Sequence, residues 1–252
     1  MIETIIFIGL IALIISANLY NKFRLQRKNH AKLQKGIYQL SLLLSLIQNL
    51  QRHRGVCANL DPNNRQQQQR LSAEINSIWD SLISPEYDGN QTRLHIQKRN
   101  WEALAAQPEN SFMPHCQLIE MLLNELNVIA DTCSLTSTQT NINHSELWQN
   151  LLERPMFAES LGKLRALGNK AASLGYCPAD IRVQLHYQLQ CLANNSMDSR
   201  TCIEIKSLIE KEILEPEKIH IEPRVYFQRM TQAIDAQIQI TLEHLNELKQ
   251  VN

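Results

Sequence analysis

Apolar residues recur at steps of three and four positions along most of the chain beyond residue 36, and this spacing constrains the fold more than any other feature. The first such run contains Ile37, Leu40, Leu44 and Ile47. Side chains at this spacing lie on one face of an α-helix. Only 7 glycines and 8 prolines occur in 252 residues, which leaves little of the turn material that sheets require. We therefore expect an all-α fold, an antiparallel helical bundle built as two stacked four-helix bundles or as two bundles that share long helices.

The periodic runs also predict where individual helices begin and end. Turn-forming or polar residues at 61–63, 84–90 and 134–143, together with a break near Pro155, are expected to separate them. The segment 134–143 would then be a loop between two halves of the body. Beyond the first helix, we expect helices over 64–84, around Trp101, over 114–133, 147–152, 156–174 and 179–194, after Asp198, and from Pro223 nearly to the end.

The N-terminal segment differs from the rest of the chain. No charged residue occurs from Thr4 to Asn21, and a helix over this stretch would be about 27 Å long, close to the roughly 30 Å hydrocarbon core of a bilayer. The start carries Glu3 and no Lys or Arg, unlike a secretory signal. We therefore expect a transmembrane anchor over residues 1–21. The alternative is a buried helix of a soluble protein, which is usually shorter.

Basic residues follow this segment and predict its orientation. Six Lys and Arg residues lie within residues 22–35, so the positive-inside bias places the rest of the chain in the cytoplasm. We expect a basic juxtamembrane segment over 22–35 and a helical body over 36–252. The protein would then be a single-pass protein of the inner (cytoplasmic) membrane, with its body facing the cytoplasm.

Charge and motifs exclude several functional classes. The 25 Lys and Arg residues balance the 25 Asp and Glu residues, so no global field attracts a nucleic-acid backbone. The chain has no Gly-rich phosphate loop, no Gly-x-Ser-x-Gly elbow and no His-Glu-x-x-His sequence. We expect neither a nucleic-acid partner, nor enzyme activity, nor a cofactor.

The cysteines predict no metal centre. No two of the six are separated by the two to four residues that structural zinc sites use. His115 and Cys116 are adjacent, and neighbouring side chains on a helix point about 100° apart. We interpret the cysteines as small buried hydrophobic residues in a reducing compartment.

Arginines on apolar helix faces are the main candidates for a functional site. Arg54, Arg165 and Arg224 each continue the apolar stripe of the helix that contains them, while Arg229 flanks the last stripe and Arg52 points toward a polar face. A buried guanidinium needs a carboxylate or a bound anion, unless its head reaches water. Both partners remain open, and the candidate internal carboxylates are Glu120, Glu125 and Glu159.

Three segments in order resemble the nitrate- and nitrite-sensing (NIT) domain family. Residues 50–55, with the sequence LQRHRG, resemble its Leu-Gln-x-Glu-Arg-Gly signature. Residues 159–169 resemble its second arginine-glycine helix, and residues 226–235 resemble its final helix. The resemblance covers the chain from about Lys35 to its C-terminus. It implies an all-helical double bundle in which arginines from separate helices converge on one nitrate or nitrite.

Carried onto this chain, the resemblance suggests that the anion is bound by Arg54, Arg165, Arg52 and either Arg229 or Arg224. Guanidinium groups suit this role because nitrate is planar and accepts bidentate hydrogen bonds. Binding would shift the population between two bundle arrangements. Because the chain ends at Asn252 with the last helix, we expect it to signal in trans to a separate output protein. We also expect a homodimer, since the long first helix could continue into a paired stalk.

One residue departs from the family signature, because His53 stands where the signature has glutamate. Its titration would make binding depend on pH near 6 to 7, but we favour a surface position for this residue. The second functional hypothesis is a membrane-anchored helical scaffold without a small-molecule ligand. The two hypotheses differ in whether the arginines converge with no carboxylate among them.

Overall fold

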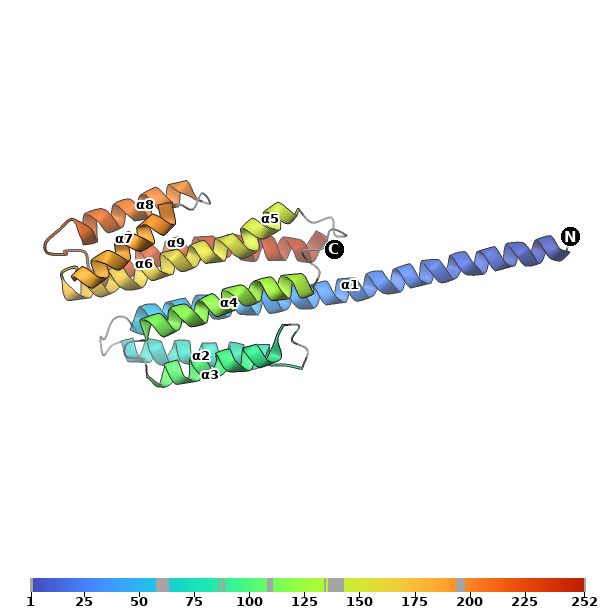
Figure 1. Cartoon of the computed structure of the whole chain (residues 1–252), viewed down its shortest axis with the longest axis horizontal. Coiled ribbons are helices and arrows are strands. Elements are labelled where there is room, and N and C mark those ends of the chain that lie inside the picture. The colour runs from blue at the N-terminus through green and yellow to red at the C-terminus, as the bar shows by residue number, and fades with distance from the viewer. Residues whose placement is uncertain are drawn as a thin grey trace.

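The computed structural model is helical throughout the part of the chain that it describes. That part comprises residues 2–57, 64–85, 87, 89–107, 111–133, 135, 143–193 and 198–251, without the side chains of residues 2–12, 14, 64, 144, 250 and 251. No strand occurs within these ranges. The all-α prediction is confirmed, and the helices form two layers that lie side by side (Figure 1).

The first layer is a four-helix unit. It consists of α1 (Ile2–Cys57), α2 (Asn64–Leu82), α3 (Gln91–Ala106) and α4 (Phe112–Thr132). Both α2 and α4 pack against α1, and α3 packs against α4. Their apolar faces form one hydrophobic core in which Ile47, Trp79 and Trp101 are wholly buried.

The second layer contains the remaining helices, with α6 and α9 as its central pair. Its own core includes Phe157, Tyr226 and Met230. Near the C-terminus Leu245 and Leu248 belong to the core of the first layer, so α9 contributes to both cores. The elements are α5 (His144–Trp148), η1 (Gln149–Glu153), α6 (Arg154–Leu174), α7 (Ala179–Ala193), α8 (Ser199–Ile209), η2 (Glu210–Leu214) and α9 (Pro223–Val251).

The chain does not break at Pro155, so the predicted break is wrong. The π-helical turn η1 joins α5 to α6 in one helical run, and Pro155 lies in the first turn of α6. Pro155 removes one backbone N–H donor from this continuous run, and the wider π-helical turn lies directly before it, where the regular hydrogen-bond pattern is interrupted. The predicted turn at 61–63 lies outside the described residues, as does the predicted loop 134–143 except for Leu135 and Asn143.

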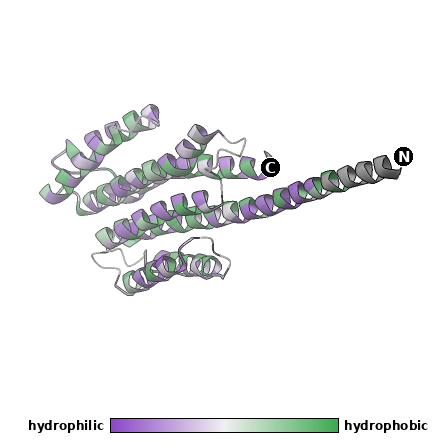
Figure 2. Ribbon diagram, turned by 45° about the vertical axis from the view of Figure 1, so that its right-hand side comes forward, coloured by the Kyte–Doolittle hydropathy of each residue, from purple (hydrophilic) through white to green (hydrophobic). Residues whose placement is uncertain are grey.

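The N-terminal part of α1 extends far beyond both layers (Figure 1). Figure 2 shows that hydrophobic and hydrophilic residues alternate along the helices of the layers, as amphipathic packing requires. Within the described residues no helix is long and apolar enough to cross a bilayer. The predicted anchor over 1–21 therefore finds no support in the fold, although most of its side chains lie outside the described part.

Candidate functional site

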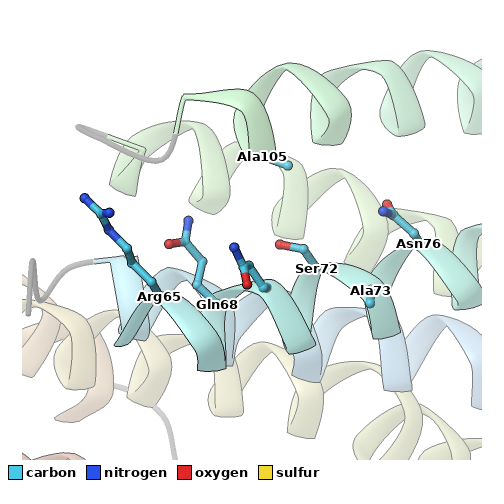
Figure 3. A pocket seen from close by; sticks show the side chains of 7 residues that line it. Arg65, Gln68, Ser72, Ala73, Asn76 and Ala105 are labelled. Atoms are coloured by element: carbon cyan, nitrogen blue, oxygen red, sulfur yellow. The ribbon is translucent and has the colours of Figure 1, made fainter. Parts of the chain in front are cut away.

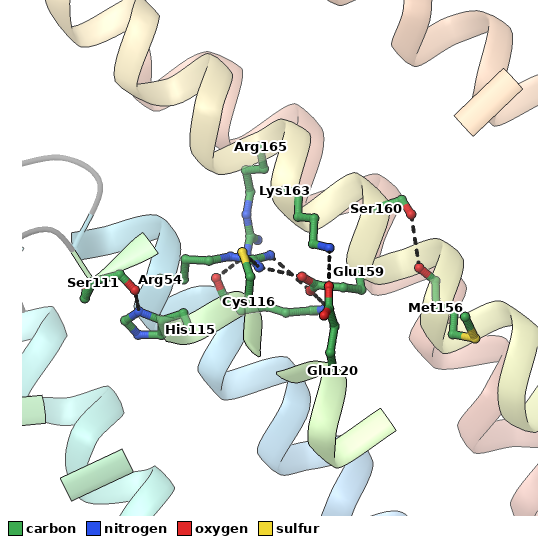
Figure 4. A network of polar contacts seen from close by, with 11 residues as sticks. Arg54, Ser111, His115, Cys116, Glu120, Met156, Glu159, Ser160, Lys163 and Arg165 are labelled. Carbon is green, nitrogen blue, oxygen red and sulfur yellow. Dashed lines mark hydrogen bonds and ion pairs between the residues drawn. The ribbon is translucent and has the colours of Figure 1, made fainter. Parts of the chain in front are cut away.

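Charged and polar side chains are buried where the C-terminal end of α1 meets α6, α9 and α4, between the two hydrophobic cores. α1 contributes Gln51 and Arg54, α6 contributes Glu159 and Arg165, and α4 adds Cys116. Arg54 and Arg165 are each only 1% exposed. In Figure 4 their guanidinium groups approach one another from opposite helices.

Arg54 is paired with a carboxylate. Its Nη1 donates to Glu159 Oε1 at 2.5 Å and its Nη2 donates to Oε2 at 3.0 Å, a bidentate geometry. Nη1 also donates to the sulfur of Cys116 at 3.1 Å. Burial alone lowers the pKa of Arg54, but the neighbouring Glu159 outweighs it and the pKa is raised. Glu159 is one of the three internal partners predicted from the sequence, so internal pairing is confirmed for this arginine.

Arg165 has no carboxylate partner among the described residues. Its Nη1 donates to the hydroxyl of Thr231 at 2.8 Å, and its Nη2 donates to the backbone carbonyl of Gln51 at 2.8 Å. The guanidinium carbon lies 4.7 Å from the ring centroid of Phe227, a cation–π contact. Burial, followed by repulsion from the charge of Arg54, lowers the pKa of Arg165 to about 9. Within the described ranges, the groups that accept hydrogen bonds from this buried cation are all neutral.

Two hydrogen-bond donors of the site have no acceptor. The Nε atoms of Arg54 and Arg165 are buried and without a hydrogen-bond partner in the described part of the protein. A buried donor left without an acceptor costs about 1–3 kcal/mol. Both arginines therefore offer donors to a further acceptor, and both retain a positive charge at neutral pH.

Glycines let the helices approach each other around the guanidinium groups. A Cβ atom at Gly162 would lie 2.7 Å from Nη2 of Arg54, and one at Gly55 would lie 2.6 Å from the ring of Phe227. Gly162 of α6 therefore leaves space beside the guanidinium group of Arg54. Gly168 of the same helix packs against Tyr226 of α9 instead.

More exposed ion pairs surround the buried cluster. Lys163 donates to Glu120 at 2.7 Å, as Figure 4 shows. Arg52 donates to both carboxylate oxygens of Asp235 at 3.1 Å, and Gln48 donates to the same carboxylate at 2.7 Å. The side chains of Arg52 and Asp235 are 37% and 39% exposed. Arg52 therefore lies at the rim of the site with its charge already compensated.

The structure does not bring the two candidate arginines of α9 into the site. Arg224 and Arg229 are both exposed. Arg224 lies in the first turn of α9, where a long side chain extends into solvent. Arg229 is two positions from both Phe227 and Thr231, which turns it toward the opposite side of the helix. α9 thus contributes an aromatic ring and a hydroxyl in place of the expected guanidinium.

Three contacts of the site were not predicted from the sequence. Thr231 lies on the same α9 stripe as Phe227, so the spacing contained the signal. Cys116 was interpreted as a small hydrophobic residue, although its sulfur contacts Arg54. The acceptor on Gln51 is a backbone carbonyl, for which the residue type carries no signal.

His53 is wholly buried, so the expected surface position is wrong. Its Nδ1 lies 2.8 Å from Nε2 of His115, and its Nε2 lies 3.2 Å from the hydroxyl of Ser72. The ring also packs edge-on against Trp101, with centroids 5.0 Å apart. Burial lowers the pKa of His53 to about 4, and burial together with His53 lowers that of His115 to about 3. Both rings are therefore neutral at pH 6 to 7, so the alternative in which His53 titrates in this range is wrong as well.

A pocket lies apart from these residues, between α2 and α3. It has a volume of about 450 Å³ and a polar lining that includes Arg65, Gln68 and Ser72 (Figure 3). None of the arginines predicted from the sequence lines it. It approaches the buried groups through Ser72, which contacts His53.

Comparisons of the chain with models of protein families, with curated proteins and with solved structures find no match. The fold and the site by themselves define an all-helical protein of two packed layers with a buried arginine pair between them.

Proposed function

We propose that the protein binds nitrate or nitrite between its two helical layers, at Arg54 and Arg165. The proposal rests on an imbalance of charge within the buried cluster. Two guanidinium groups are buried, but among the described residues of the cluster there is one buried carboxylate, Glu159, and it pairs with Arg54 alone. Arg52 at the rim is compensated by Asp235. The buried cluster therefore keeps one net positive charge, which a monovalent anion would neutralise.

The hydrogen-bonding pattern supports the same class of ligand. Nitrate and nitrite are small and planar, and their oxygens accept bidentate hydrogen bonds from planar guanidinium groups. The unpaired Nε atoms of Arg54 and Arg165 are donors of this kind. Glu159 occupies the terminal nitrogens of Arg54, so an anion at this site would compete with Glu159 or bind beside it.

The position of the site suggests how binding would be transmitted. Arg54 belongs to α1 of the first layer, whereas Arg165 and Glu159 belong to α6 of the second. An anion held by both arginines would change the free energy of contact between the layers and shift the population of their arrangements. α1 continues far beyond the layers, so a displacement at residue 54 would pass along it toward a partner copy or a separate output protein.

Titration calorimetry on the full chain in detergent micelles tests the proposal, with nitrate and nitrite as ligands and chloride and sulfate as controls. We expect saturable binding of nitrate or nitrite. Arg165→Gln should weaken it at least tenfold, because hydrogen bonds to charged groups contribute about 1.5–3 kcal/mol. The matched control is Arg229→Gln, an exposed position on α9 that should leave binding unchanged.

Two outcomes would contradict the proposal. The first is that none of the four anions gives binding heat, although circular dichroism shows that the chain is folded. The second is an equal loss of affinity in Arg165→Gln and Arg229→Gln, which would mean that binding depends on general surface charge.

The membrane anchor is a separate part of the proposal. It is supported by the uncharged stretch from Thr4 to Asn21 and by the basic residues within 22–35. We expect the full chain to sediment with the cytoplasmic membrane and a chain lacking residues 1–21 to remain in the supernatant. Equal distribution of the two chains would overturn the anchor without affecting the anion site.

A helical scaffold without a ligand is the second candidate function. The observation that favours it is the Arg54–Glu159 pair, since a carboxylate already satisfies both terminal nitrogens of this arginine. Under this hypothesis the cluster joins the two layers and no anion enters. Calorimetry distinguishes the hypotheses, because a scaffold would bind none of the four anions while retaining its fold.

A further inference from the structure

Three metal-binding side chains meet beside the arginine cluster. His53 and Cys57 lie one turn apart on α1, and His115 reaches them from α4. Nδ1 of His53 lies 2.8 Å from Nε2 of His115 and 3.5 Å from the sulfur of Cys57. The donor atoms of all three residues lie within 4.8 Å of one another. Donors bound to one tetrahedral ion at about 2.0–2.3 Å would be separated by comparable distances.

The hydrogen bonds around the two imidazoles orient their nitrogen atoms toward each other. The backbone carbonyl of Ser111 lies 2.7 Å from Nδ1 of His115, so this nitrogen carries a proton and Nε2 presents its lone pair. The hydroxyl of Ser72 lies 3.2 Å from Nε2 of His53, and its oxygen can accept a hydrogen bond when that nitrogen carries a proton. Partners of this kind, on the outer nitrogen of each ring, hold histidine ligands in place in metal sites.

We propose that His53, His115 and Cys57 bind a divalent transition-metal ion of the zinc class. Two imidazoles and a thiolate suit Zn²⁺, and three protein ligands leave its fourth coordination position open to an exogenous ligand. Binding would release one proton, that of the Cys57 thiol. The Nδ1 proton of His53 would move to Nε2 and stay there, donated in a hydrogen bond to the hydroxyl oxygen of Ser72. This inference is independent of the anion site, since it uses none of the arginines.

The surroundings of the cluster allow an ion to reach it. Cys57 is half-buried at the end of α1, whereas both histidines are wholly buried. Ser72 lines the open pocket between α2 and α3 and contacts His53 (Figure 3). The half-buried Cys57 and the pocket beside Ser72 therefore mark the side of the cluster where solvent comes nearest to it, and a metal site requires an entry path of this kind.

Titration of the full, chelator-treated chain with Co²⁺ tests the proposal, because a cobalt–thiolate bond produces charge-transfer absorption. We expect the absorption to saturate at one ion per chain and to disappear on addition of Zn²⁺. Cys57→Ala should abolish it, and His115→Gln should weaken Co²⁺ binding at least tenfold. Cys191→Ala is the matched control, since Cys191 is a free, exposed cysteine and its loss should leave the spectrum unchanged.

X-ray absorption of the zinc-loaded chain provides a second measurement. We expect Zn–N distances of about 2.0–2.1 Å and a Zn–S distance of about 2.3 Å.

Cobalt–thiolate absorption that persists in Cys57→Ala but is lost in Cys191→Ala would overturn the proposal. So would a folded chain that binds neither ion. In either case His53 and His115 would form a hydrogen-bonded pair of neutral rings and nothing more.

Discussion

Glu159 of α6 accepts hydrogen bonds from both terminal nitrogens of Arg54 in α1, at 2.5 and 3.0 Å. The two residues belong to different layers, so this pair connects the two halves of the fold. It also distinguishes the two arginines, because the acceptors of Arg165 in the part of the chain that the structure describes are neutral. Removing the charge of Glu159 should therefore affect both stability and anion binding.

We expect Glu159→Gln to lower the free energy of unfolding by about 3–5 kcal/mol, because Arg54 is left buried and without a counter-charge. Sodium nitrate should restore more stability to this variant than to the parent chain, since an anion bound to the folded state shifts the unfolding equilibrium. Both effects are measured by urea unfolding in sodium nitrate and in sodium chloride at the same concentration. Glu120→Gln, at an exposed ion pair, is the control. Identical nitrate and chloride curves for Glu159→Gln would contradict the predicted anion binding.

Arg52→Ala should change stability by no more than about 1 kcal/mol, because its partner Asp235 is also partly exposed and solvent screens such pairs. Arg54→Ala should cost about 3–5 kcal/mol, since it leaves the carboxylate of Glu159 buried and unpaired. Denaturant titration of the two variants measures this contrast between positions only two residues apart. A loss in Arg52→Ala as large as that in Arg54→Ala would show that the rim pair is as important as the buried one.

Gly168→Ala should destabilise the protein by about 1–3 kcal/mol, the usual cost of overpacking. The added methyl group would overlap the phenol of Tyr226, which is wholly buried and donates to the carbonyl of Leu164 at 2.9 Å. The ring cannot move away without losing this hydrogen bond. Thermal unfolding monitored by circular dichroism provides the measurement, with Lys170→Ala on the exposed face of α6 as the control. A variant as stable as the parent would mean that α6 and α9 can separate at low cost.

In the presence of a chelator, stability should fall as the pH decreases below about 6.5. Burial lowers the folded-state pKa of His53 to about 4 and that of His115 to about 3, while both titrate near 6.5 when unfolded. Between these values the unfolded state binds more protons, so acid favours unfolding. The loss from His53 alone is on the order of 3 kcal/mol by pH 4.

Chemical denaturation at several pH values measures this slope, and His53→Gln should reduce it. His220→Asn, at an exposed histidine, should retain the slope of the parent chain. If His53→Gln and the parent chain had the same slope between pH 6.5 and 4, carboxylates would account for the acid sensitivity and the histidines would not.

The sequence alone predicted the all-helical class, most helix positions and the burial of Arg54 and Arg165. These follow from local rules, because apolar residues at steps of three and four fix which face of a helix turns inward. The same rules gave the wrong result at Pro155, where a π-helical turn keeps the helix continuous. They also gave the wrong environment for His53, because its residue type does not show that α4 covers it.

Only the tertiary structure decided which groups face each other at the site. Glu159 is 105 residues from Arg54 along the chain, and the carbonyl that accepts from Arg165 is 114 residues away. Periodicity identifies a buried face but contains no information on the rotation and height at which a second helix packs against it. Those two quantities place Glu159 against Arg54, bring His115 to His53, and leave Arg224 and Arg229 at the surface.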